Sequence, residues 1–373
     1  MNGTPGPGIR RAATHNPDPR AAVAELVALL GDAADGGVIF FCAPTYDLEA
    51  LAAALRAGFR GPVTGCTGAG QIGPEGYQRD GIVAIGMTAA SATMRVYPVT
   101  PLADCQRAAQ AAAAQAAEDL RIDGRRAFGL ILADGLSLAE ERLAATLYQS
   151  LGAVPLVGGS AGDDLQFEHT FVFVDGEFRE GAAAFAVVAT SEPFSIFKIQ
   201  HFAPTRKRMV ITAADPARRL VREINGRPAA QAYADLVGVP VADLNATVFS
   251  TNPVMLRLGD QYYVRSIQQV CEDGSLAFYC AIEAGLVLTI GEGVDVLEAL
   301  EAGFAGVPAD ADAVLGCDCI LRRLEFEQRG LRDSIGASLA RRRVVGFSTF
   351  GEQYNGVHVN QTFVGVALGG SHV

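Results

Sequence analysis

The sequence predicts an α/β protein built from repeated strand–helix–strand units, with mixed sheets covered by helices and two intimately packed domains. Three observations support this fold class. The chain has 373 residues, which is too long for one ordinary hydrophobic core. Hydrophobic residues make up 50% of it and charged residues 19%, as in compact globular proteins. A strand–helix–strand pattern that ends in a glycine turn recurs along the chain.

The first two units share one order of elements. Each begins with an apolar strand, continues with a helix that Asp47 or Ser137 can cap, and ends with a strand that opens near a proline. The same elements follow one another in both copies, so both are expected to fold alike. Strand, helix, strand and turn are expected at 38–42, 47–56, 62–65 and 65–70, and again at 128–132, 137–150, 155–158 and 158–162.

A third unit occurs late in the chain. Its spacing from the second is about twice the spacing between the first two, which favours a degenerate fourth unit around 245–266. Extended apolar segments after each turn are expected to add strands to the sheets. The glycine turns themselves either line a ligand crevice between the two domains or simply reverse the chain. The third unit is expected at 313–316, 317–330, 344–346 and 346–352.

Composition argues against several classes of partner. A formal net charge of −11 opposes binding to nucleic acid or to anionic lipid. No apolar run reaches the roughly 20 residues that span a bilayer, so no membrane-embedded segment is expected. Residues 1–20 are rich in Gly and Pro and are expected to form a flexible N-terminal arm. Seven cysteines without a Cys-x-x-Cys pair are typical of reduced thiols in a cytoplasmic protein.

One catalytic motif deserves weighing against its context. Gly158-x-Ser160-x-Gly162 matches the nucleophile elbow of α/β-hydrolases, which must feed a helix. Here the chain runs on into a strand from Thr170 instead. Ser160 also aligns with Thr67 and Ser348 of the other units, which favours a turn hydroxyl that bonds its own backbone. A serine hydrolase at Ser160 is therefore kept as an alternative function.

A second glycine motif also fails on context. Gly68-x-Gly70-x-x-Gly73 matches the dinucleotide fingerprint, but Pro74-Glu75-Gly76 follows where a helix should begin. Neither of the two lysines is preceded by glycine, so a phosphate-binding P-loop is not predicted. The glycines are more consistent with a turn than with a nucleotide site.

Three stretches resemble the FIST family of bacterial sensory proteins. The resemblance implies ligand sensing and an N-terminal and a C-terminal FIST domain, expected at 21–230 and 231–373. The stretches are Val157-Gly158-Gly159-Ser160-Ala161-Gly162-Asp163 with Phe171-Val172-Phe173-Val174-Asp175-Gly176, Glu223-Ile224-Asn225-Gly226-Arg227-Pro228-Ala229 with Tyr233, and Gly346-Phe347-Ser348-Thr349-Phe350-Gly351-Glu352 with Asn360-Gln361-Thr362.

Within that family the chain is similar to the NosP-type nitric-oxide-sensing haem proteins. Segment 317–322, Cys-Asp-Cys-Ile-Leu-Arg, resembles a Cys-x-x-Arg-type stretch of the C-terminal domain. The resemblance implies a cytoplasmic sensor that holds haem b, detects nitric oxide or a similar diatomic gas, and makes no product. Its implied partner is a histidine kinase or a cyclic-di-GMP synthase or phosphodiesterase, and a homo-oligomer is compatible with it. The alternative is a haem-free sensor of amino acids or other small metabolites.

His201 is the expected iron ligand, because the resemblance implies a histidine and a neutral imidazole leaves one haem face open to a gas. Strand alternation places Phe197 and Ile199 on the same apolar face as His201. Arg206 and Arg208 would meet the haem propionates, or else belong to a solvated turn. His201 is also compatible with an ordinary half-buried strand histidine.

The other histidines are weaker candidates. His169 and His358 are held in reserve: His169 is expected at the surface beside acidic residues, and His358 in a hydrogen-bonded core position. His15 and His372 lie in the arm and at the C-terminus, where a rigid ligand is not expected. Thiolate ligation by Cys317 or Cys319 is less favoured, because only Arg322 and Arg323 are near in sequence to promote ionisation.

Overall fold

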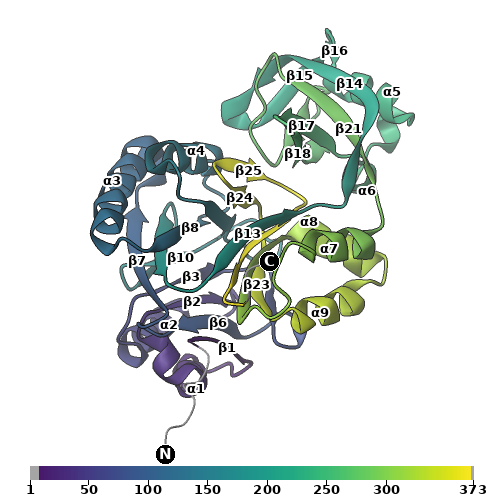
Figure 1. Cartoon of the computed structure of the whole chain (residues 1–373). Coiled ribbons are helices and arrows are strands. Elements are labelled where there is room, and N and C mark those ends of the chain that lie inside the picture. Colours follow the sequence, from purple (N-terminus) through teal and green to yellow (C-terminus); the bar gives the residue numbers. More distant parts are fainter. Residues whose placement is uncertain (1–7, 371–373) are drawn as a thin grey trace, which may run out of the picture. The chain divides into compact units, whose positions relative to one another are not determined.

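The computed structural model of the chain describes residues 8–370, which form a mixed α/β fold (Figure 1). The predicted fold class is confirmed. Two compact units divide the described residues. The first contains residues up to 198 together with 304–357 and 363–370, and the second contains 199–303 and 358–362. The second unit therefore takes residues from both of the domains expected at 21–230 and 231–373. His372 lies outside the described residues.

Three six-stranded sheets share one strand order. In each, a parallel pair lies next to an antiparallel strand, an outer strand lies beyond that strand, and a hairpin flanks the other side. The first sheet runs β1 (Ile9–Thr14), β6 (Ile82–Met87), β2 (Gly37–Cys42), β3 (Val63–Thr67), β10 (Val172–Val174) and β11 (Glu177–Arg179). The second runs β7 (Ala92–Val99), β12 (Ala183–Thr190), β8 (Arg126–Ala133), β9 (Leu156–Ser160), β24 (Glu352–Tyr354) and β25 (Val357–Val359). The third runs β13 (Phe194–Ile199), β26 (Phe363–Leu368), β22 (Ala313–Cys319), β23 (Val344–Thr349), β4 (Gln71–Gly73) and β5 (Gly76–Gln78).

The three predicted strand–helix–strand units are present, but the helix expected over 317–330 is wrong in its bounds: residues 317–319 belong to β22, and two helices follow. Each parallel pair is joined through helix: β2 and β3 through α2 (Leu48–Gly58), β8 and β9 through α4 (Glu140–Leu151), and β22 and β23 through α8 (Ile320–Gln328) and α9 (Arg332–Arg341). The predicted cap at Asp47 is present, because its carboxylate accepts the Ala50 N–H at 3.0 Å. Ser137 instead donates to the Asp134 carbonyl, and α4 begins later, at Glu140.

The three strand–helix–strand units exchange their hairpins in a cycle. The β4–β5 hairpin that follows the first unit pairs with β23 of the third. The β10–β11 hairpin of the second unit pairs with β3 of the first. Strand β24 of the third unit pairs with β9 of the second. Each sheet is therefore completed by a different unit, and no unit can satisfy all of its strand edges alone.

The glycine turns lie at the centre of this exchange and are buried, so the expectation that they line a crevice is wrong. Ala69 N–H donates to the Ser348 carbonyl at 3.0 Å, and Phe350 N–H donates to the Ser160 carbonyl at 3.1 Å. Gly162 N–H donates to the Thr67 carbonyl at 3.1 Å. Each turn thus bonds the turn of another unit, because backbone amides buried away from water must find partners inside the fold.

Close backbone approach is the physical reason for glycine here. A Cβ added at Gly158 would lie 2.1 Å from the carbonyl oxygen of Ile131 on the neighbouring parallel strand. At Gly346, the equivalent position of the third unit, it would lie 1.8 Å from the carbonyl oxygen of Gly316. The repeated glycine is therefore a packing requirement of the parallel pair.

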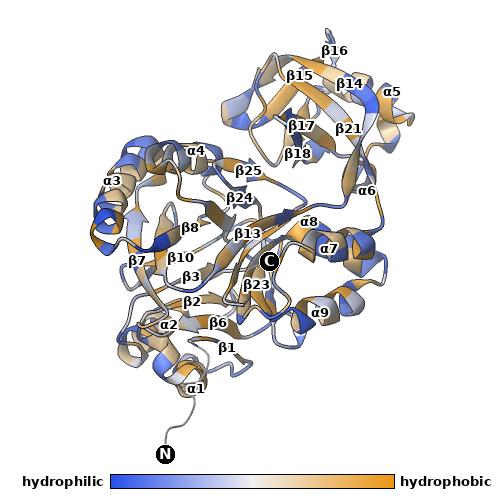
Figure 2. Cartoon of the chain, viewed as in Figure 1, coloured by the Kyte–Doolittle hydropathy of each residue, from blue (hydrophilic) through white to orange (hydrophobic). Residues whose placement is uncertain are grey.

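Helices cover the outer faces of the sheets. Helices α1 (Pro19–Leu30) and α2 pack over the first sheet, and α3 (Cys105–Asp123) and α4 over the second, each enclosing an apolar core. Figure 2 shows mostly hydrophobic strands, whereas α3 carries many hydrophilic residues. Among residues 8–370, no helix combines the length and apolar character needed to cross a bilayer.

Part of the predicted N-terminal arm is ordered structure. Residues 9–14 form β1, which pairs with β6 along its whole length, and Ile9, Ala12 and Thr14 are buried. The chain then caps α1, as the Asp18 carboxylate accepts the Ala21 N–H at 2.8 Å. Gly and Pro flank the strand in the sequence but do not enter it, and composition averaged over 1–20 therefore concealed it.

The second compact unit is built on an eight-stranded sheet, mostly antiparallel hairpins around two short helices. The predicted fourth strand–helix–strand unit is wrong: 245–266 contains a helix followed by an antiparallel hairpin of this sheet, with no parallel pair. Its strands are β14 (Phe202–Asp215), β15 (Leu220–Ile224), β16 (Arg227–Pro228), β17 (Val254–Leu258), β18 (Gln261–Arg265), β19 (Ile267–Val270), β20 (Leu276–Phe278) and β21 (Val287–Gly293), and its helices are α5 (Ala229–Val237) and α6 (Ala246–Thr251). Helix α7 (Val296–Phe304) follows.

Candidate functional site

His201 lies in a break between two strands and not within one continuous strand. Strand β13 ends at Ile199 and β14 begins at Phe202. The His201 side chain is 1% exposed, and its ring centroid is 4.2 Å from that of Phe202. Its backbone carbonyl accepts the Val294 N–H at 2.9 Å. The residue is thus more deeply buried than an ordinary half-buried strand histidine.

Phe197 and Ile199 are both buried, and both already have close packing partners. The Phe197 ring packs against Phe304 and Phe363 with centroids 5.4 Å away in each case. A Cβ at Gly303 would come within 2.5 Å of the Ile199 side chain, so α7 lies directly on it. A porphyrin needs a wide apolar slot, and these residues do not form one in this conformation.

The two arginines expected to meet propionates are exposed. Arg206 and Arg208 lie on β14, where the pairing with β21 is irregular between Pro204 and Arg208. His201 is buried, so the arginines and the imidazole differ in their access to solvent. This exposure agrees with the solvated alternative for the Arg206–Arg208 run.

The reserve histidine His358 is buried in a polar setting. It is 1% exposed on β25, and its carbonyl accepts a hydrogen bond from the Arg265 guanidinium. Nearby in the chain, the Gln361 side-chain oxygen accepts from the Ser266 hydroxyl at 3.0 Å. This environment matches the hydrogen-bonded core position expected from the sequence.

His169, the other reserve ligand, lines a hollow of about 440 Å³ in the first compact unit. The hollow lies beyond the carboxyl end of β2, the edge at which open α/β sheets bind ligands. Strand β2 contributes the residues that follow it, and the segment between β9 and β10 contributes most of the rest. The lining residues are Pro44, Thr45, Asp163, Gln166, Glu168, His169, Phe171 and Glu180.

Asp163 shapes the loop 163–169 that forms one wall of this hollow. Its carboxylate accepts the backbone N–H groups of Phe167, Glu168 and His169 at 2.9, 2.6 and 3.0 Å. Asp164, Leu165 and Phe167 have left-handed φ values of 57, 71 and 55°, which are unfavourable for residues other than glycine. The three hydrogen bonds to one carboxylate offset that cost and hold the loop in a defined shape.

The hollow is acidic. His169 Nδ1 lies 2.9 Å from Glu180 Oε1, and this hydrogen bond raises the pKa of His169 above its ordinary value. The His169 ring also stacks against Phe171. Asp163, Glu168 and Glu180 add three carboxyl groups to the lining, which contains no Lys or Arg. Such a surface favours a ligand with a positive charge or an amino group.

A second polar cluster holds the Cys-x-x-Arg-type segment in place. Arg322 Nε donates to Asp318 Oδ1 at 2.7 Å, with both side chains almost completely buried. Tyr77 of the exchanged β4–β5 hairpin donates to the other Asp318 oxygen. Cys317 and Cys319 are 1% exposed, and burial raises the pKa of the Cys317 thiol well above its usual range. The cluster links the hairpin to β22, and Cys317 in particular is a poor thiolate ligand.

The Ser160 hydroxyl does not bond its own backbone, so that expectation is wrong. Ser160 is fully buried at the end of β9, and its hydroxyl oxygen accepts from the Gln353 side-chain amide at 3.0 Å. The aligned Thr67 plays a similar part, because its hydroxyl oxygen accepts the Phe171 N–H at 3.1 Å. Within residues 8–370, no group of three His, Cys, Asp or Glu side chains is arranged to hold a metal ion.

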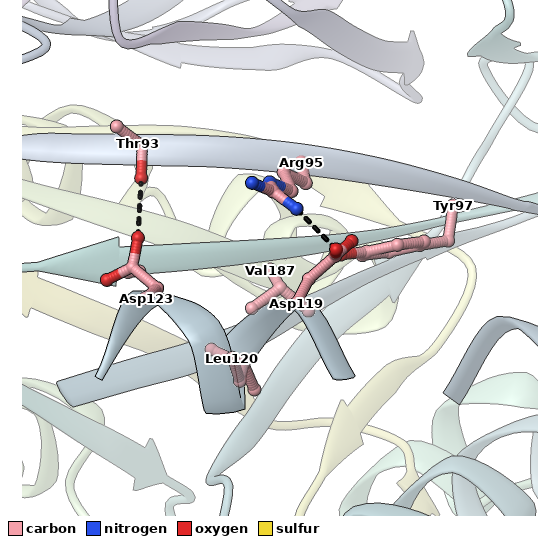
Figure 3. A pocket seen from close by; sticks show the side chains of 8 residues that line it. Thr93, Arg95, Tyr97, Asp119, Leu120, Asp123 and Val187 are labelled. Atoms are coloured by element: carbon pink, nitrogen blue, oxygen red, sulfur yellow. Dashed lines mark hydrogen bonds and ion pairs between the residues drawn. The ribbon is translucent and has the colours of Figure 1, made fainter. Parts of the chain in front are cut away.

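A small pocket lies between α3 and the second sheet, and its charged residues contact one another (Figure 3). Its volume of about 10 Å³ is close to that of one water molecule. Asp119 accepts from the Tyr97 hydroxyl at 2.6 Å and pairs with Arg95 at 2.5 Å. Asp123 is bonded by Arg125, at 2.7 Å. These charges satisfy one another and tie the helix to the sheet.

Sequence reasoning missed most of the acidic hollow. It named His169 but not Thr45, Gln166, Glu168 or Glu180 as its companions. One signal was available: residues 163–169 follow a strand and a glycine turn without starting a helix, which marks an irregular loop at a strand's carboxyl end. The hairpin exchange decides which other segments lie beside the loop 163–169. That exchange has no local signature in the sequence.

Interlocked strand–helix–strand units, with a hollow of about 440 Å³ at the carboxyl end of one strand, define a mixed α/β protein. The family model of the FIST N domain matches residues 37–227, and that of the FIST C domain matches residues 229–355. The chain belongs to the FIST family, whose domains are associated with sensory signalling. An uncharacterized protein of Methanocaldococcus jannaschii is 30% identical over 84 residues, which cover 22% of this chain and 16% of that protein.

Proposed function

We propose that this chain is a FIST sensor that binds a small amino-bearing metabolite, such as an amino acid or an amine, in the hollow around His169. The observation that carries the proposal is the acidic, loop-walled hollow of about 440 Å³ at the carboxyl end of β2. A hollow of this size falls in the range of small-molecule sites. It combines fixed polar groups with apolar surface from Pro44 and Phe171.

The polar groups suit an ammonium ligand. Glu168 and Glu180 offer carboxylate oxygens, and charge-assisted hydrogen bonds from an ammonium group are about twice as strong as neutral ones. The Phe171 ring offers a π-face for the same cation. Thr45 and Gln166 supply neutral donors and acceptors that can read the rest of the ligand.

The same loop provides a route to a partner. Phe167 is 43% exposed and stacks on Phe350 of the third unit, with ring centroids 4.7 Å apart. A ligand that contacts Glu168 or His169 acts on the loop one or two residues from Phe167, and so changes the position of this exposed ring. In this proposal the partner is a cytoplasmic histidine kinase or a cyclic-di-GMP synthase or phosphodiesterase, and the chain itself makes no product.

A thermal-shift screen of amino acids and amines against the purified chain tests the proposal. A compound that binds only the folded state raises the midpoint of unfolding, and the stabilisation grows with the logarithm of its concentration relative to Kd. Glu168→Gln and Glu180→Gln should each weaken a binding compound about tenfold, because each removes a charged partner. Glu283→Gln, at an exposed carboxylate of the second compact unit, is the matched control. Binding that survives both hollow variants would place the ligand elsewhere.

Haem-based sensing of nitric oxide is a second candidate, favoured by the burial of His201 beside Phe202. It also rests on the resemblance to NosP-type proteins. Because the Phe197 and Ile199 side chains are packed, haem b would need that face to open before it could enter. Titration with haemin gives the test: a stoichiometric Soret band that shifts in His201→Ala supports ligation by His201. No band at equimolar haemin removes the haem candidate.

A further inference from the structure

A second hollow, of about 490 Å³, is lined by residues that the acidic hollow does not use. It lies in the first compact unit, beside the first residues of β1 and the residue that precedes β22. In contrast to the hollow around His169, three of its seven lining residues are arginines. The lining residues are Ile9, Arg10, Arg11, Leu29, Pro74, Asp312 and Arg343.

Arg11 has a buried donor without an acceptor. Its Nη1 atom is removed from solvent and has no hydrogen-bond partner among the described residues. The pKa of Arg11 is lowered, first by burial and then by the charge of Arg343. Two like charges beside each other and a buried unmet N–H are costly unless a ligand of opposite charge completes the arrangement.

The other charges of the hollow leave that requirement unmet. Arg10 is already engaged, because its guanidinium pairs with Asp32 at 2.9 Å and donates to the Leu30 carbonyl. The Arg343 guanidinium donates to the Ala311 carbonyl at 3.0 Å, and the residue has a left-handed φ of 56°. Within residues 8–370, neither Arg11 nor Arg343 forms an ion pair with a carboxylate. Asp312 lines the hollow as well, and its charge interacts with that of Arg343 from beyond ion-pair distance, so it offsets only part of the positive charge.

We propose that this hollow binds a small phosphate-type oxoanion, with Arg11 and Arg343 as its charged contacts. Guanidinium groups present paired N–H donors that match the oxygens of phosphate. Ile9, Leu29 and Pro74 form an apolar flank, which fits a phosphomonoester with a small apolar body as well as the free ion. The site is separate from the hollow around His169, so either proposal can fail without the other.

Isothermal titration of the full chain in phosphate-free buffer tests the site, with inorganic phosphate and phenyl phosphate as separate probes. Arg11→Gln and Arg343→Asn should each weaken binding at least about tenfold, as expected for loss of a hydrogen bond from a charged donor. Asparagine is chosen at 343 because it tolerates the left-handed backbone. Asp312→Asn should strengthen binding, since it removes the carboxylate that lines the hollow and repels the anion. Tighter binding of phenyl phosphate would identify an ester as the ligand class, and tighter binding of phosphate would identify the free ion.

Stability without ligand separates a binding role from a structural one. If Arg11 serves an anion, Arg11→Gln should unfold at the same or a higher temperature than the parent chain in phosphate-free buffer, because the repulsion between the half-buried Arg11 and the exposed Arg343 is relieved. Arg107→Gln, which alters an exposed arginine paired with Asp104, is the control and should leave phosphate binding unchanged. Absence of heat with both probes up to 10 mM, or equal binding by parent and Arg11→Gln, would overturn the proposal. So would a lower unfolding temperature of Arg11→Gln in phosphate-free buffer.

Discussion

The rings of Phe167 and Phe350 stack with centroids 4.7 Å apart and planes inclined by 22°. Phe167 belongs to the loop that walls the acidic hollow, and Phe350 to the glycine turn of the third unit. The contact joins a proposed ligand site to the buried centre at which the units meet. Phe167 is at the same time 43% exposed, so part of this joint faces solvent.

Loss of the Asp163 carboxylate should loosen the loop. In Asp163→Asn, one oxygen must serve three backbone N–H groups that now share a carboxylate, so we expect a loss of about 1–3 kcal/mol in the free energy of unfolding. Amide hydrogen exchange over 163–169 should accelerate in the folded state. Asp164→Asn is the control, because asparagine accepts the left-handed φ of 57° there. Unchanged exchange in Asp163→Asn would contradict this account of the loop.

The buried pair of Asp318 and Arg322 should be costly to break. Asp318→Asn leaves a fully buried guanidinium without its counter-charge, so we expect a loss of about 3–5 kcal/mol in unfolding free energy, measured in urea. Tyr77→Phe should cost less, because it removes a single hydrogen bond from the same cluster. A double-mutant cycle should show coupling between the two changes; simple additivity would mean that the residues act independently.

The central glycines should not accept a methyl group. Gly158→Ala places Cβ 2.1 Å from the Ile131 carbonyl oxygen, which forces the parallel strands β8 and β9 apart. We expect a loss of several kcal/mol in stability or failure to fold, read from the midpoint of thermal unfolding. Gly306→Ala is the matched control, since nothing lies within 4 Å of its added Cβ. Equal midpoints for the two variants would show that the close strand approach is not limiting.

The His169–Glu180 pair should make stability depend on pH. The folded pKa of His169 is raised above its ordinary value of 6.5 by the Glu180 hydrogen bond. A raised pKa means that the stabilising contribution is fully present below the unfolded value and is lost as the pH rises through the folded one. An NMR titration of the imidazole should give a pKa above 6.5 that falls in Glu180→Gln, because the hydrogen bond with the largest effect on it is lost. A parent value at or below 6.5 would contradict the pairing.

The sequence was informative where structure depends on local pattern. The glycine turns at Gly65, Gly158 and Gly346, with the strands before them, predicted three equivalent units, because a close parallel pair restricts side-chain size locally. The function of the turns was misjudged, since burial at a junction and exposure at a crevice both call for glycine. The strand at 9–14 was not predicted, because flanking Gly and Pro dominated the composition and its residues do not alternate strictly between buried and accessible.

The candidate site was only partly predictable. His169 could be named from the sequence. Thr45 is more than 100 residues away from it and Glu180 about 10, and only the tertiary structure brings the three together. The alternation that grouped Phe197 with Ile199 was sound. It did not reveal that Phe304 and Phe363, distant in sequence, already fill the space beside Phe197.

The exchanged hairpins set a limit on how the chain can be divided. A fragment that stops near residue 230 keeps β9 but loses β24, and it keeps the β4–β5 hairpin but loses β23. It would present an unpaired strand edge in one place and a hairpin without a sheet in another, both of which promote aggregation. The two family segments are therefore inseparable as folding units. Recombination or truncation at their boundary would yield insoluble halves and not independent sensory modules.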